Sequence, residues 1–227
     1  MEHRPDVRPV HGSGPVDLCR KQKDEAERAA MRHSSAMNDQ VVAAAIGAVR
    51  TGVRENELAA LVNREFLARG ADCEGTQLVC FGANGADPHH SGGSTVLQPG
   101  DSVIFDLFTP ISRYWCDMTR TVFYQTVSGK QREVYELVRQ ANEAAEAMIR
   151  PGVLLSDLDR CARDIITKGG YGPCFTHRLG HGCGLDCHEP PDVSGVSDTP
   201  LEPGMVFSVE PGIYLPGEVG VRIEDLV

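Results

Sequence analysis

The pattern of hydrophobic and polar positions predicts two pairs of consecutive helices. Apolar residues recur at helical spacing along each of four stretches, and a glycine closes the second helix of each pair. We expect these helices at residues 37–50 and 56–70 in the first pair, and at 132–149 and 156–170 in the second. Regular structure is predicted to begin near Asp24.

Extended, β-rich segments follow each helix pair. TQLVCF, DSVIFDLF and TRTVFYQT lie in the first half, whereas MVFSVE, GIYL and VGVRIED lie in the second. Each half therefore has the order ααβ, which predicts an α+β fold with helices backing a sheet. Pockets commonly form between such units, so we expect a functional site between the halves.

The two halves also resemble each other in sequence. The stretch RTGVRENEL, starting at Arg50, and RPGVLLSDL, starting at Arg150, share Arg, Gly, Val and Leu at an offset of 100 residues. The same offset relates Ala44 to Ala144, Ala45 to Ala145 and Gly70 to Gly170. These matches indicate an internal duplication, with a coincidental similarity between helices as the alternative.

The N-terminal segment differs from the rest of the chain. Residues 1–20 are rich in proline, glycine and charge and have neither a helical nor a strand period, which predicts an irregular arm or linker remnant. The regular segments that follow predict one domain at residues 21–227, a length sufficient to bury a sizeable core.

Composition argues against several functional classes. The formal net charge of -10 at pH 7 disfavours a nucleic-acid binder, because phosphate backbones require concentrated Lys and Arg. The N-terminus lacks an apolar leader segment, and no run approaches the roughly 18 apolar residues of a membrane span. We therefore expect a cytoplasmic protein without a nucleic-acid or membrane partner.

The eight cysteines do not form a recognisable framework. They include no C-x-x-C pair, so we expect reduced thiols. Cys183 and Cys187 flank a histidine-rich stretch, and a zinc site built on them is one alternative. Because C-x-x-x-C without a second pair lacks the usual zinc spacing, small apolar filler is the favoured interpretation of both residues.

Four acidic residues stand in or beside apolar segments that otherwise resemble buried strands. Asp106 lies inside SVIFDLF, and Asp117 precedes another strand, a spacing that suits neighbouring strands joined by a turn near TPIS. Glu210 and Glu224 lie in the C-terminal segment VFSVEPGIYLPGEVGVRIEDLV. A lone ionised carboxylate is costly to bury, so such a residue shifts its pKa, pairs with a cation or binds a metal.

Taken singly, these acids have a simpler interpretation, in which Asp117 pairs with Arg120 and Glu224 pairs with Arg222. Taken together, four converging carboxylates would repel one another unless several are protonated or divalent cations hold them. The stretch HRLGHGCGLDCHEPP adds His181, flanked by glycines, as an imidazole ligand. Four carboxylates balance the charge of two divalent cations, which predicts a dinuclear site.

These motifs resemble the pita-bread (M24) metallopeptidase family, which includes methionine aminopeptidases, prolidases and Xaa-Pro aminopeptidases. The resemblance covers about residues 24–227. It implies an α+β pita-bread (creatinase/aminopeptidase) fold for the catalytic domain, with duplicated ααβ halves and pseudo-two-fold symmetry around a dinuclear metal site. The family's five ligands fall on Asp106, Asp117, His181, Glu210 and Glu224.

The resemblance also implies how these ligands divide between two divalent metal ions. Asp106 would chelate one ion, His181 and Glu210 would hold the other, and Asp117 and Glu224 would bridge both. Ligation dominated by oxygen with a single imidazole favours manganese, with cobalt, iron and zinc as alternatives.

Three histidines match positions that the family uses around its substrate. His89, in NGADPHH, resembles the histidine that contacts the scissile peptide. His188, in CHEPP, and His177, in THRLGH, resemble the pair lining the subsites for the substrate's carbonyl and its proline side. His90 competes with His89, but the family's position follows the proline directly.

Catalysis is accordingly expected from His89, His188 and Glu210, the last as general base and proton shuttle. Substrate contacts are expected from the three histidines and from Arg222. By charge-assisted hydrogen bonds, Arg222 would also steady Asp106 or Glu224.

The contexts EPGIY and RIED resemble the Xaa-Pro-cleaving branch of the family. This resemblance implies a metal-dependent exopeptidase that hydrolyses the bond between an N-terminal residue and a following proline, using a hydroxide that bridges the two ions. The expected partner is a peptide with proline at its second position, and the resemblance allows a homodimer. The alternatives are a catalytically silent pita-bread peptide-binding module, a methionine aminopeptidase and a metal-free creatinase-like amidinohydrolase.

Overall fold

Two helix pairs, each followed by strands, make up the fold of the computed structural model, which describes residues 12–75 and 77–227. The helices are α1 (Ser13–Lys21), α2 (Glu25–Gly47), α3 (Glu55–Ala68), α4 (Gly129–Ala147) and α5 (Leu155–Lys168), with 3-10 turns η1 (Gly82–Ala86) and η2 (Gly172–Cys174). The strands are β1 (Leu78–Phe81), β2 (Ser102–Ile111), β3 (Tyr114–Phe123), β4 (Gly180–Gly182), β5 (Glu189–Val193), β6 (Ser208–Val209), β7 (Gly212–Leu215), β8 (Val219–Arg222) and β9 (Asp225–Leu226).

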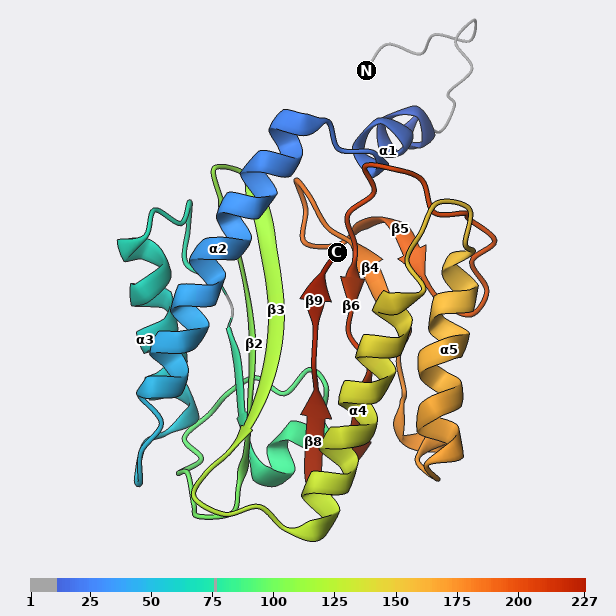
Figure 1. Cartoon of the computed structure of the whole chain (residues 1–227). Helices are drawn as coiled ribbons and strands as arrows, with labels where there is room; N and C mark the ends of the chain where they lie inside the picture. The colour runs from blue at the N-terminus through green and yellow to red at the C-terminus, as the bar shows by residue number, and fades with distance from the viewer. Residues whose placement is uncertain (1–11, 76) are drawn as a thin grey trace, which may run out of the picture.

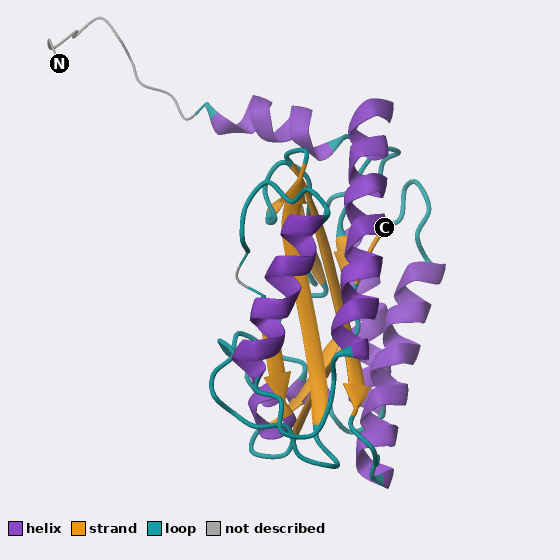
Figure 2. Ribbon diagram, turned by 90° about the vertical axis from the view of Figure 1, so that its left-hand side faces the viewer, coloured by secondary structure: helices purple, strands orange, loops and turns teal. Residues whose placement is uncertain are grey.

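The strands lie side by side in the middle of the molecule, and the helices cover them (Figures 1 and 2). The first half contributes an antiparallel sheet in the order β1-β2-β3, and the second contributes the pairs β4-β5, β6-β9 and β7-β8. Helix α2 packs on β2 and β3, whereas α4 packs on β6, β7 and β8. The two halves meet where β8 and β9 contact β3.

Each long helix begins at a reciprocal cap that is visible in the sequence. The Asp24 carboxylate accepts from the backbone N–H of Glu27 at 2.9 Å, and the Glu27 carboxylate accepts from the N–H of Asp24 at 2.8 Å. Ser128 and Gln131 repeat this arrangement before α4. Helix α2 therefore begins beside Asp24 and is longer than the apolar stretch 37–50, but regular structure begins earlier than predicted, with α1 at Ser13.

The internal duplication is visible in the geometry of the two halves. Helices α3 and α5 occupy ranges that are offset by 100 residues, 55–68 and 155–168. The paired glycines share left-handed backbone angles, since φ is +90° at Gly70 and +91° at Gly170. Only glycine adopts such angles without strain, so both helices of this type end in the same way.

Each half has a hydrophobic core of its own. One cluster includes Leu58, Phe66 and Phe105 of the first half, and the other includes Leu158 and Phe207 of the second. All five side chains are at most 2% exposed. Burial of this kind contributes roughly 1.5–3 kcal/mol for each large apolar side chain, so each half is packed as a unit.

The hairpin of β2 and β3 turns at the end of TPIS, close to where the sequence predicts it. Within this motif, Thr109, Pro110 and Ile111 still belong to β2. Ser112 and Arg113 form the turn with φ of 53° and 72°. A two-residue turn with both φ values positive matches the twist of antiparallel strands, which explains the extension of both strands to this point.

The register of this hairpin sets the two aspartates on one face. Asp106 lies opposite Thr119, and Asp117 lies two residues before Thr119. Directly opposite residues share a face of a sheet, and so do residues two apart on one strand. Both carboxylates therefore project toward the same side of the sheet.

Part of the predicted N-terminal arm is helical. The sequence predicts an irregular segment over residues 1–20, of which residues 1–11 lie outside the described residues. The remainder largely forms α1, none of whose residues is buried. The Arg20 guanidinium anchors α1 to the Glu189 carboxylate at 2.5 Å. A short helix of this kind depends on tertiary contacts rather than on its own periodicity, so the sequence pattern did not reveal it.

The second half contains two short strands, β4 and β5, that the sequence pattern did not predict. Their segment is rich in Gly, Pro and His and lacks the alternation of a strand. Among the helices of the described residues, none is long and apolar enough to cross a membrane.

Two buried asparagines tie the long helices to the strands beside the acidic residues. The Asn38 side chain of α2 donates to the Leu107 carbonyl at 2.8 Å, and the Asn142 side chain of α4 donates to the Val209 carbonyl at 3.0 Å. Leu107 follows Asp106 directly. A buried donor that satisfies a strand carbonyl thus fixes the position of each helix against its sheet.

We expect Asn142→Ala to lower the free energy of unfolding by about 1–3 kcal/mol, because the buried Val209 carbonyl would lose its side-chain donor. Urea unfolding followed by circular dichroism measures this change. Gln140→Ala, an exposed amide on the same helix, serves as the matched control. Equal unfolding midpoints for the two variants would contradict the anchoring role of Asn142.

Candidate metal centre

All five predicted ligand residues line one cavity of about 420 Å³. They come from widely separated segments: Asp106 from β2, Asp117 from β3, His181 from β4, Glu210 just after β6, and Glu224 between β8 and β9. The first two are fixed by the hairpin register, and the others come from the second half of the chain. The cavity therefore lies between the halves, where the sequence analysis expects it.

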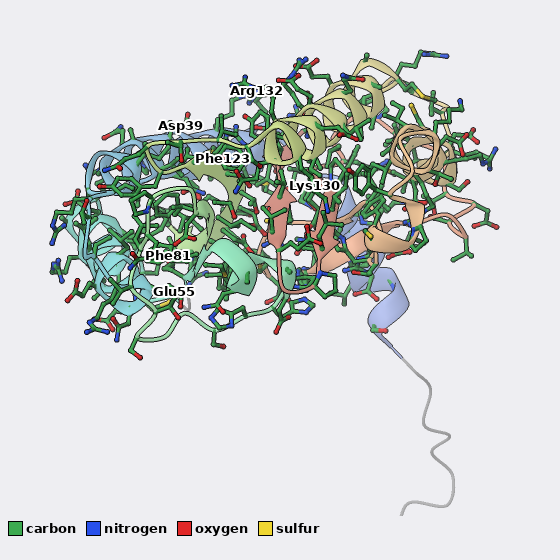
Figure 3. All side chains as sticks on the ribbon, turned by 90° about the horizontal axis from the view of Figure 1, so that it is seen from below. Asp39, Glu55, Phe81, Phe123, Lys130 and Arg132 are labelled. Carbon is green, nitrogen blue, oxygen red and sulfur yellow. The ribbon has the colours of Figure 1, made fainter. Side chains whose placement is uncertain are left out.

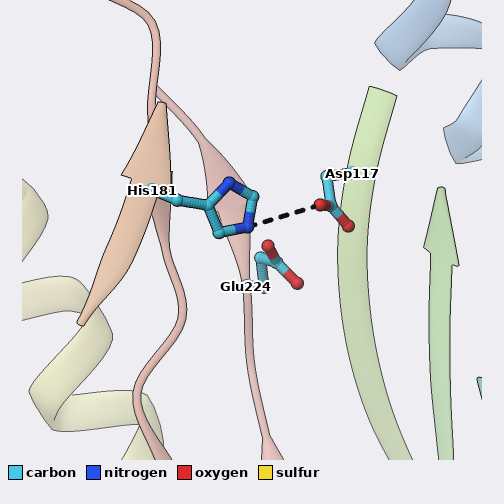
Figure 4. Close-up of side chains that lie close together, drawn as sticks. All are labelled: Asp117, His181 and Glu224. Atoms are coloured by element: carbon cyan, nitrogen blue, oxygen red, sulfur yellow. Dashed lines mark ion pairs between the residues drawn. The ribbon is translucent and has the colours of Figure 1, made fainter. Parts of the chain in front are cut away.

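The closest group within the cavity is Asp117, His181 and Glu224 (Figure 4). Each offers one ligand atom, and these atoms all lie within 4.8 Å of one another. The His181 Nε2 atom lies 3.7 Å from Asp117 Oδ2 and 3.3 Å from Glu210 Oε1. One imidazole nitrogen thus faces two carboxylates, an arrangement suited to sharing a cation.

Two carboxylate oxygens in this cluster have no hydrogen-bond partner among the described residues. They are Asp117 Oδ1 and Glu224 Oε1, and both are fully buried. An unpaired buried carboxylate oxygen is costly, because it has given up water without compensation. Divalent cations would compensate both oxygens, so the donor set fits metal ions.

Arginine compensates one of the four carboxylates. A short hydrogen-bonded ion pair joins the buried Arg222 guanidinium to Asp106. For Asp117, Glu210 and Glu224, the described residues supply no Lys or Arg ion pair. Three largely buried carboxylates therefore face one another with a neutral imidazole, which favours bound cations.

The pKa shifts of these residues reflect the same crowding of buried carboxylates. Burial, followed by the charges of neighbouring carboxylates, raises the pKa of Asp117 and of Glu224 well above the usual range. Burial also raises the pKa of Glu210 to about 7, although the Arg222 charge opposes this shift. Burial lowers the pKa of His181 to about 4, which keeps the imidazole neutral and able to donate a lone pair to a metal.

The structure decides between the two partners expected for Arg222. Its guanidinium bonds Asp106, and it also donates from Nε to Thr119 Oγ1 at 3.0 Å. Thr119 in turn donates its hydroxyl to Glu224 Oε2 at 2.7 Å. Arg222 therefore bonds Asp106 directly and reaches Glu224 only through Thr119.

The alternative in which Asp117 pairs with Arg120 does not hold within the described residues. The Arg120 guanidinium instead donates to the Glu224 carbonyl at 2.6 Å and to Asp225 Oδ1 at 2.6 Å. Arg120 thus fixes the backbone that carries Glu224 and leaves the Asp117 carboxylate free for the cavity.

The three histidines predicted to contact substrate line the same cavity as the acidic residues. His89 and His188 are exposed, whereas His177 is half-buried. The rings of His181 and His188 lie 3.9 Å apart between centroids. Exposure of His89 and His188 at the cavity wall leaves both side chains accessible to a bound molecule.

His177 belongs to a hydrogen-bond chain that ends at Arg222. Its Nδ1 lies 2.7 Å from the Arg178 carbonyl and its Nε2 lies 2.8 Å from the Tyr214 hydroxyl. Because a carbonyl only accepts, Nδ1 carries the proton and Nε2 accepts from Tyr214. The same hydroxyl accepts from Arg222 at 3.0 Å. Burial lowers the pKa of His177 to about 4, consistent with this neutral tautomer.

A buried ion pair on α5 holds the segment that carries His177. The Asp159 carboxylate is 2% exposed, accepts from the Leu179 N–H at 3.0 Å and bonds Arg163. The Arg163 guanidinium also donates to the carbonyls of Phe175 and His177, at 3.0 and 2.9 Å. Helix α5 thereby fixes the backbone on both sides of His177.

The two cysteines in the histidine-rich stretch differ from each other. None of the eight cysteines, all within the described part of the chain, is in a disulfide. Cys183 is buried filler, as expected. Cys187, however, lines the cavity and its thiol lies 3.3 Å from Asp117 Oδ2, so its description as apolar filler is wrong. The contact between the Cys187 thiol and Asp117 arises from the tertiary fold, so the spacing of the two cysteines in the sequence did not reveal it.

Several polar residues around the centre were not singled out from the sequence. They are Thr119, Ser208, Tyr214, Asp159 and Arg163. Ser208 donates its hydroxyl to Glu210 Oε1 at 3.0 Å. Tyr214 lies within EPGIY, a motif that pointed to the Xaa-Pro-cleaving branch of the family, so this residue could have been identified from the sequence. The other residues follow no motif that distinguishes them from ordinary strand or helix positions.

Comparison with known proteins agrees with this geometry. Residues 29–227 match the sequence profile described as Metallopeptidase family M24. The chain is 42% identical over 204 residues to the putative dipeptidase YkvY of Bacillus subtilis (strain 168), a match that covers 89% of this chain and 56% of that protein. It is 42% identical over 212 residues to the Xaa-Pro dipeptidase of Lactobacillus helveticus, covering 92% of this chain and 58% of that protein. The chain thus spans less than two thirds of the length of these relatives.

Solved structures agree with the sequence matches. Prolidase from Pyrococcus furiosus is similar with a TM-score of 0.92 and 38% identity, covering 94% of this chain and 64% of that one. Dipeptidase PepE from Mycobacterium ulcerans is similar with a TM-score of 0.94 and 36% identity, covering 98% and 60%. These likenesses confirm the predicted pita-bread fold, and the chain belongs to metallopeptidase family M24.

Proposed function

We propose that this protein is a metal-dependent exopeptidase that hydrolyses the bond between an N-terminal residue and a following proline. The observation that carries the proposal is the cavity itself, in which two buried carboxylate oxygens find no hydrogen-bond partner in the described part of the chain and three histidines line the wall. Two relatives of similar sequence are named as dipeptidases, one of them as an Xaa-Pro dipeptidase.

Two divalent cations would be held by Asp106, Asp117, His181, Glu210 and Glu224. When bound, such ions supply a water of lowered pKa and polarise a carbonyl oxygen. The oxygen-dominated donor set favours manganese, with cobalt, iron and zinc as alternatives.

Glu210 is the residue we assign to proton transfer. Its Oε1 accepts from the Ser208 hydroxyl and faces His181 Nε2 at 3.3 Å, so one carboxylate oxygen is fixed in orientation. Such a carboxylate would take a proton from the attacking water and deliver it to the departing amine nitrogen. Both transfers need a group that is held within hydrogen-bond reach of the reacting atoms.

The histidines would bind and polarise the peptide. His89 and His188 are exposed at the cavity wall and would donate to the carbonyl oxygen as negative charge develops on it. Burial keeps His177 neutral, its Nε2 accepts from the Tyr214 hydroxyl, and the ring would face the proline side of the substrate. A cavity of about 420 Å³ accommodates a small peptide, at the lower end of the range for ligand sites.

The proposal is tested with metal-stripped protein refilled with manganese, cobalt or zinc. We expect hydrolysis of an Xaa-Pro dipeptide, an Xaa-Pro tripeptide or both, and none of a Met-Ala peptide, only after metal is added. Cleavage confined to the dipeptide would indicate a dipeptidase, and cleavage of the longer substrate an aminopeptidase. Preferred cleavage of Met-Ala would indicate a methionine aminopeptidase, and metal binding without turnover a peptide-binding module.

A further inference from the structure

A buried glutamate outside the metal cavity is used by none of the roles assigned above. Glu55 is the first residue of α3, and its side chain is 0% exposed (Figure 3). A carboxylate at a helix N-terminus is favoured by the helix dipole, but such a position is normally exposed to solvent. Complete burial of Glu55 therefore calls for specific partners.

The partners of Glu55 all lie in one segment of the chain. Oε1 accepts from the Phe81 N–H at 2.8 Å and from the Asn84 side chain at 2.9 Å. Oε2 accepts from the Gly93 N–H at 2.9 Å and lies 3.3 Å from His90 Nε2. The carboxylate thus joins the two ends of residues 81–95, which we call the His89 loop.

Backbone hydrogen bonds also hold the same loop against the start of α3. The Glu55 N–H donates to the Thr95 carbonyl at 3.2 Å and the Asn56 N–H donates to the Gly93 carbonyl at 3.0 Å. A Cβ atom added at Gly92 would lie 2.9 Å from the Val79 carbonyl, so no larger residue fits there without movement. The loop is therefore closed around the Glu55 carboxylate.

The midpoint of this loop reaches the metal cavity. Pro88 and His89 line the cavity wall, and Arg222 approaches the Pro88 carbonyl at 3.4 Å. The His89 N–H donates to Asp87 Oδ1 at 3.0 Å, a contact within the loop itself. His89 has no other hydrogen bond among the described residues, so its place depends on how the loop ends are held.

We propose that Glu55 is a positioning residue, which holds the His89 loop so that His89 faces the substrate. This inference rests on the exopeptidase function proposed above. One carboxylate replaces water for two backbone amides at opposite ends of the loop, and its charge strengthens both hydrogen bonds. Among the described residues, none of its bonds touches a predicted metal ligand, so its effect should be confined to the loop.

The test begins with Glu55→Gln, which keeps the size of the side chain but gives it a single acceptor oxygen. The amide NH2 would then face either the Phe81 or the Gly93 N–H, and one end of the loop would lose its acceptor. Glu57→Gln is the matched control, because Glu57 is exposed in the same turn and glutamine preserves its capping contact.

In manganese-loaded protein, we expect Glu55→Gln to lower kcat for an Xaa-Pro dipeptide by about 10–100-fold, with bound metal unchanged, because misplacing a substrate-positioning group by about 1 Å can cost roughly 100-fold. We also expect the amides of the His89 loop to exchange with deuterium about tenfold faster, because the loop opens locally. Glu57→Gln should match the parent protein in both measurements.

A double-mutant cycle with His89→Ala separates positioning from a general loss of structure. If Glu55 acts through His89, Glu55→Gln should change kcat by less than about twofold once His89 is absent. Equal effects in both backgrounds, or unchanged exchange of the loop, would overturn the proposal. Should Glu55→Gln fail to fold, Asn84→Ala removes one donor to the same carboxylate, and the same two readouts apply.

The exchange measurement does not depend on turnover. If the parent protein hydrolyses none of the peptides, the exopeptidase proposal fails. Faster exchange in Glu55→Gln would still support the role of Glu55 in holding the His89 loop. If the parent is active and deuterium exchange is unchanged in Glu55→Gln, the positioning role of Glu55 fails and the exopeptidase proposal stands.

Discussion

Replacing Glu210 with alanine is expected to lower turnover of an Xaa-Pro dipeptide by about 10²–10⁴-fold, the range for a lost general acid–base residue, and to reduce the bound metal by one ion. Two effects are expected because this side chain is proposed both to bind metal and to transfer protons. It lies 3.3 Å from His181 Nε2 and lines the cavity. Steady-state kinetics with manganese-loaded protein and metal analysis of the same samples measure the two effects.

Two controls accompany the Glu210 variant. Glu218→Ala removes an exposed glutamate of the same half, whose ion pair among the described residues is with Lys130 at the surface. Cys183→Ser changes a buried thiol that does not line the cavity. We expect both controls to retain turnover and metal. Full activity in Glu210→Ala, with two bound ions, would contradict the proposed centre.

The second large effect concerns stability in the absence of metal. In metal-stripped protein we expect the stabilisation by buried protonated carboxyls to be lost as the pH rises, because these groups must then give up their protons. His177 and His181, whose pKa burial lowers to about 4, oppose this change below their ordinary pKa of 6.5, so the net loss of stability is expected above about pH 6.5. The pKa of Glu210 rises from its ordinary value of 4.5 to about 7, and those of Asp117 and Glu224 are raised as well. Protonated carboxyls stabilise the folded chain below the ordinary pKa, and that stabilisation is lost as the pH passes the raised pKa.

For Glu210 alone the loss corresponds to about 3 kcal/mol, since each unit of pKa shift is worth roughly 1.4 kcal/mol. Divalent cations should reverse it, because they replace the lost protons as partners of the carboxylates. Manganese at about 100 times its dissociation constant would add roughly 3 kcal/mol at neutral pH and less at acidic pH, where protons compete.

Thermal unfolding from pH 4 to pH 8, with and without manganese, measures this dependence. Asp117→Asn removes one of the repelling charges and one ligand, so its metal-free form should depend less on pH and gain less from manganese. Asp39→Asn, an exposed aspartate on α2 (Figure 3), should behave like the parent protein. Equal stabilisation by manganese in all three proteins would contradict metal binding at Asp117.

Local patterns predicted much of the fold. The periodic apolar residues gave both helix pairs, and the offset of 100 residues gave the duplication that α3 and α5 display. Both signals are local or repetitive, so they survive in the linear sequence. The helix α1 and the strands β4 and β5 were missed because ion pairs and close backbone packing hold them, and neither leaves a periodic pattern.

The candidate site shows the same division. By itself the sequence determined which acidic and imidazole groups belong together, because carboxylates such as Asp106 inside apolar strands are too costly to be incidental. Only the tertiary structure decided which charges are compensated. It joins Arg222 to Asp106 and turns Arg120 toward Asp225, which leaves Asp117 and Glu224 each with an oxygen that no described residue pairs.

The tertiary structure also decided which side chains support the site from a distance. The Glu55 carboxylate binds the His89 loop, and the Tyr214 hydroxyl fixes the tautomer of His177. Their partners are backbone amides, carbonyls and rings from distant segments, and such groups carry no signature in residue type or spacing. The sequence therefore determined the chemistry of the centre, whereas the folded chain determined its pairing and support, because hydrogen bonds depend on positions that exist only after packing.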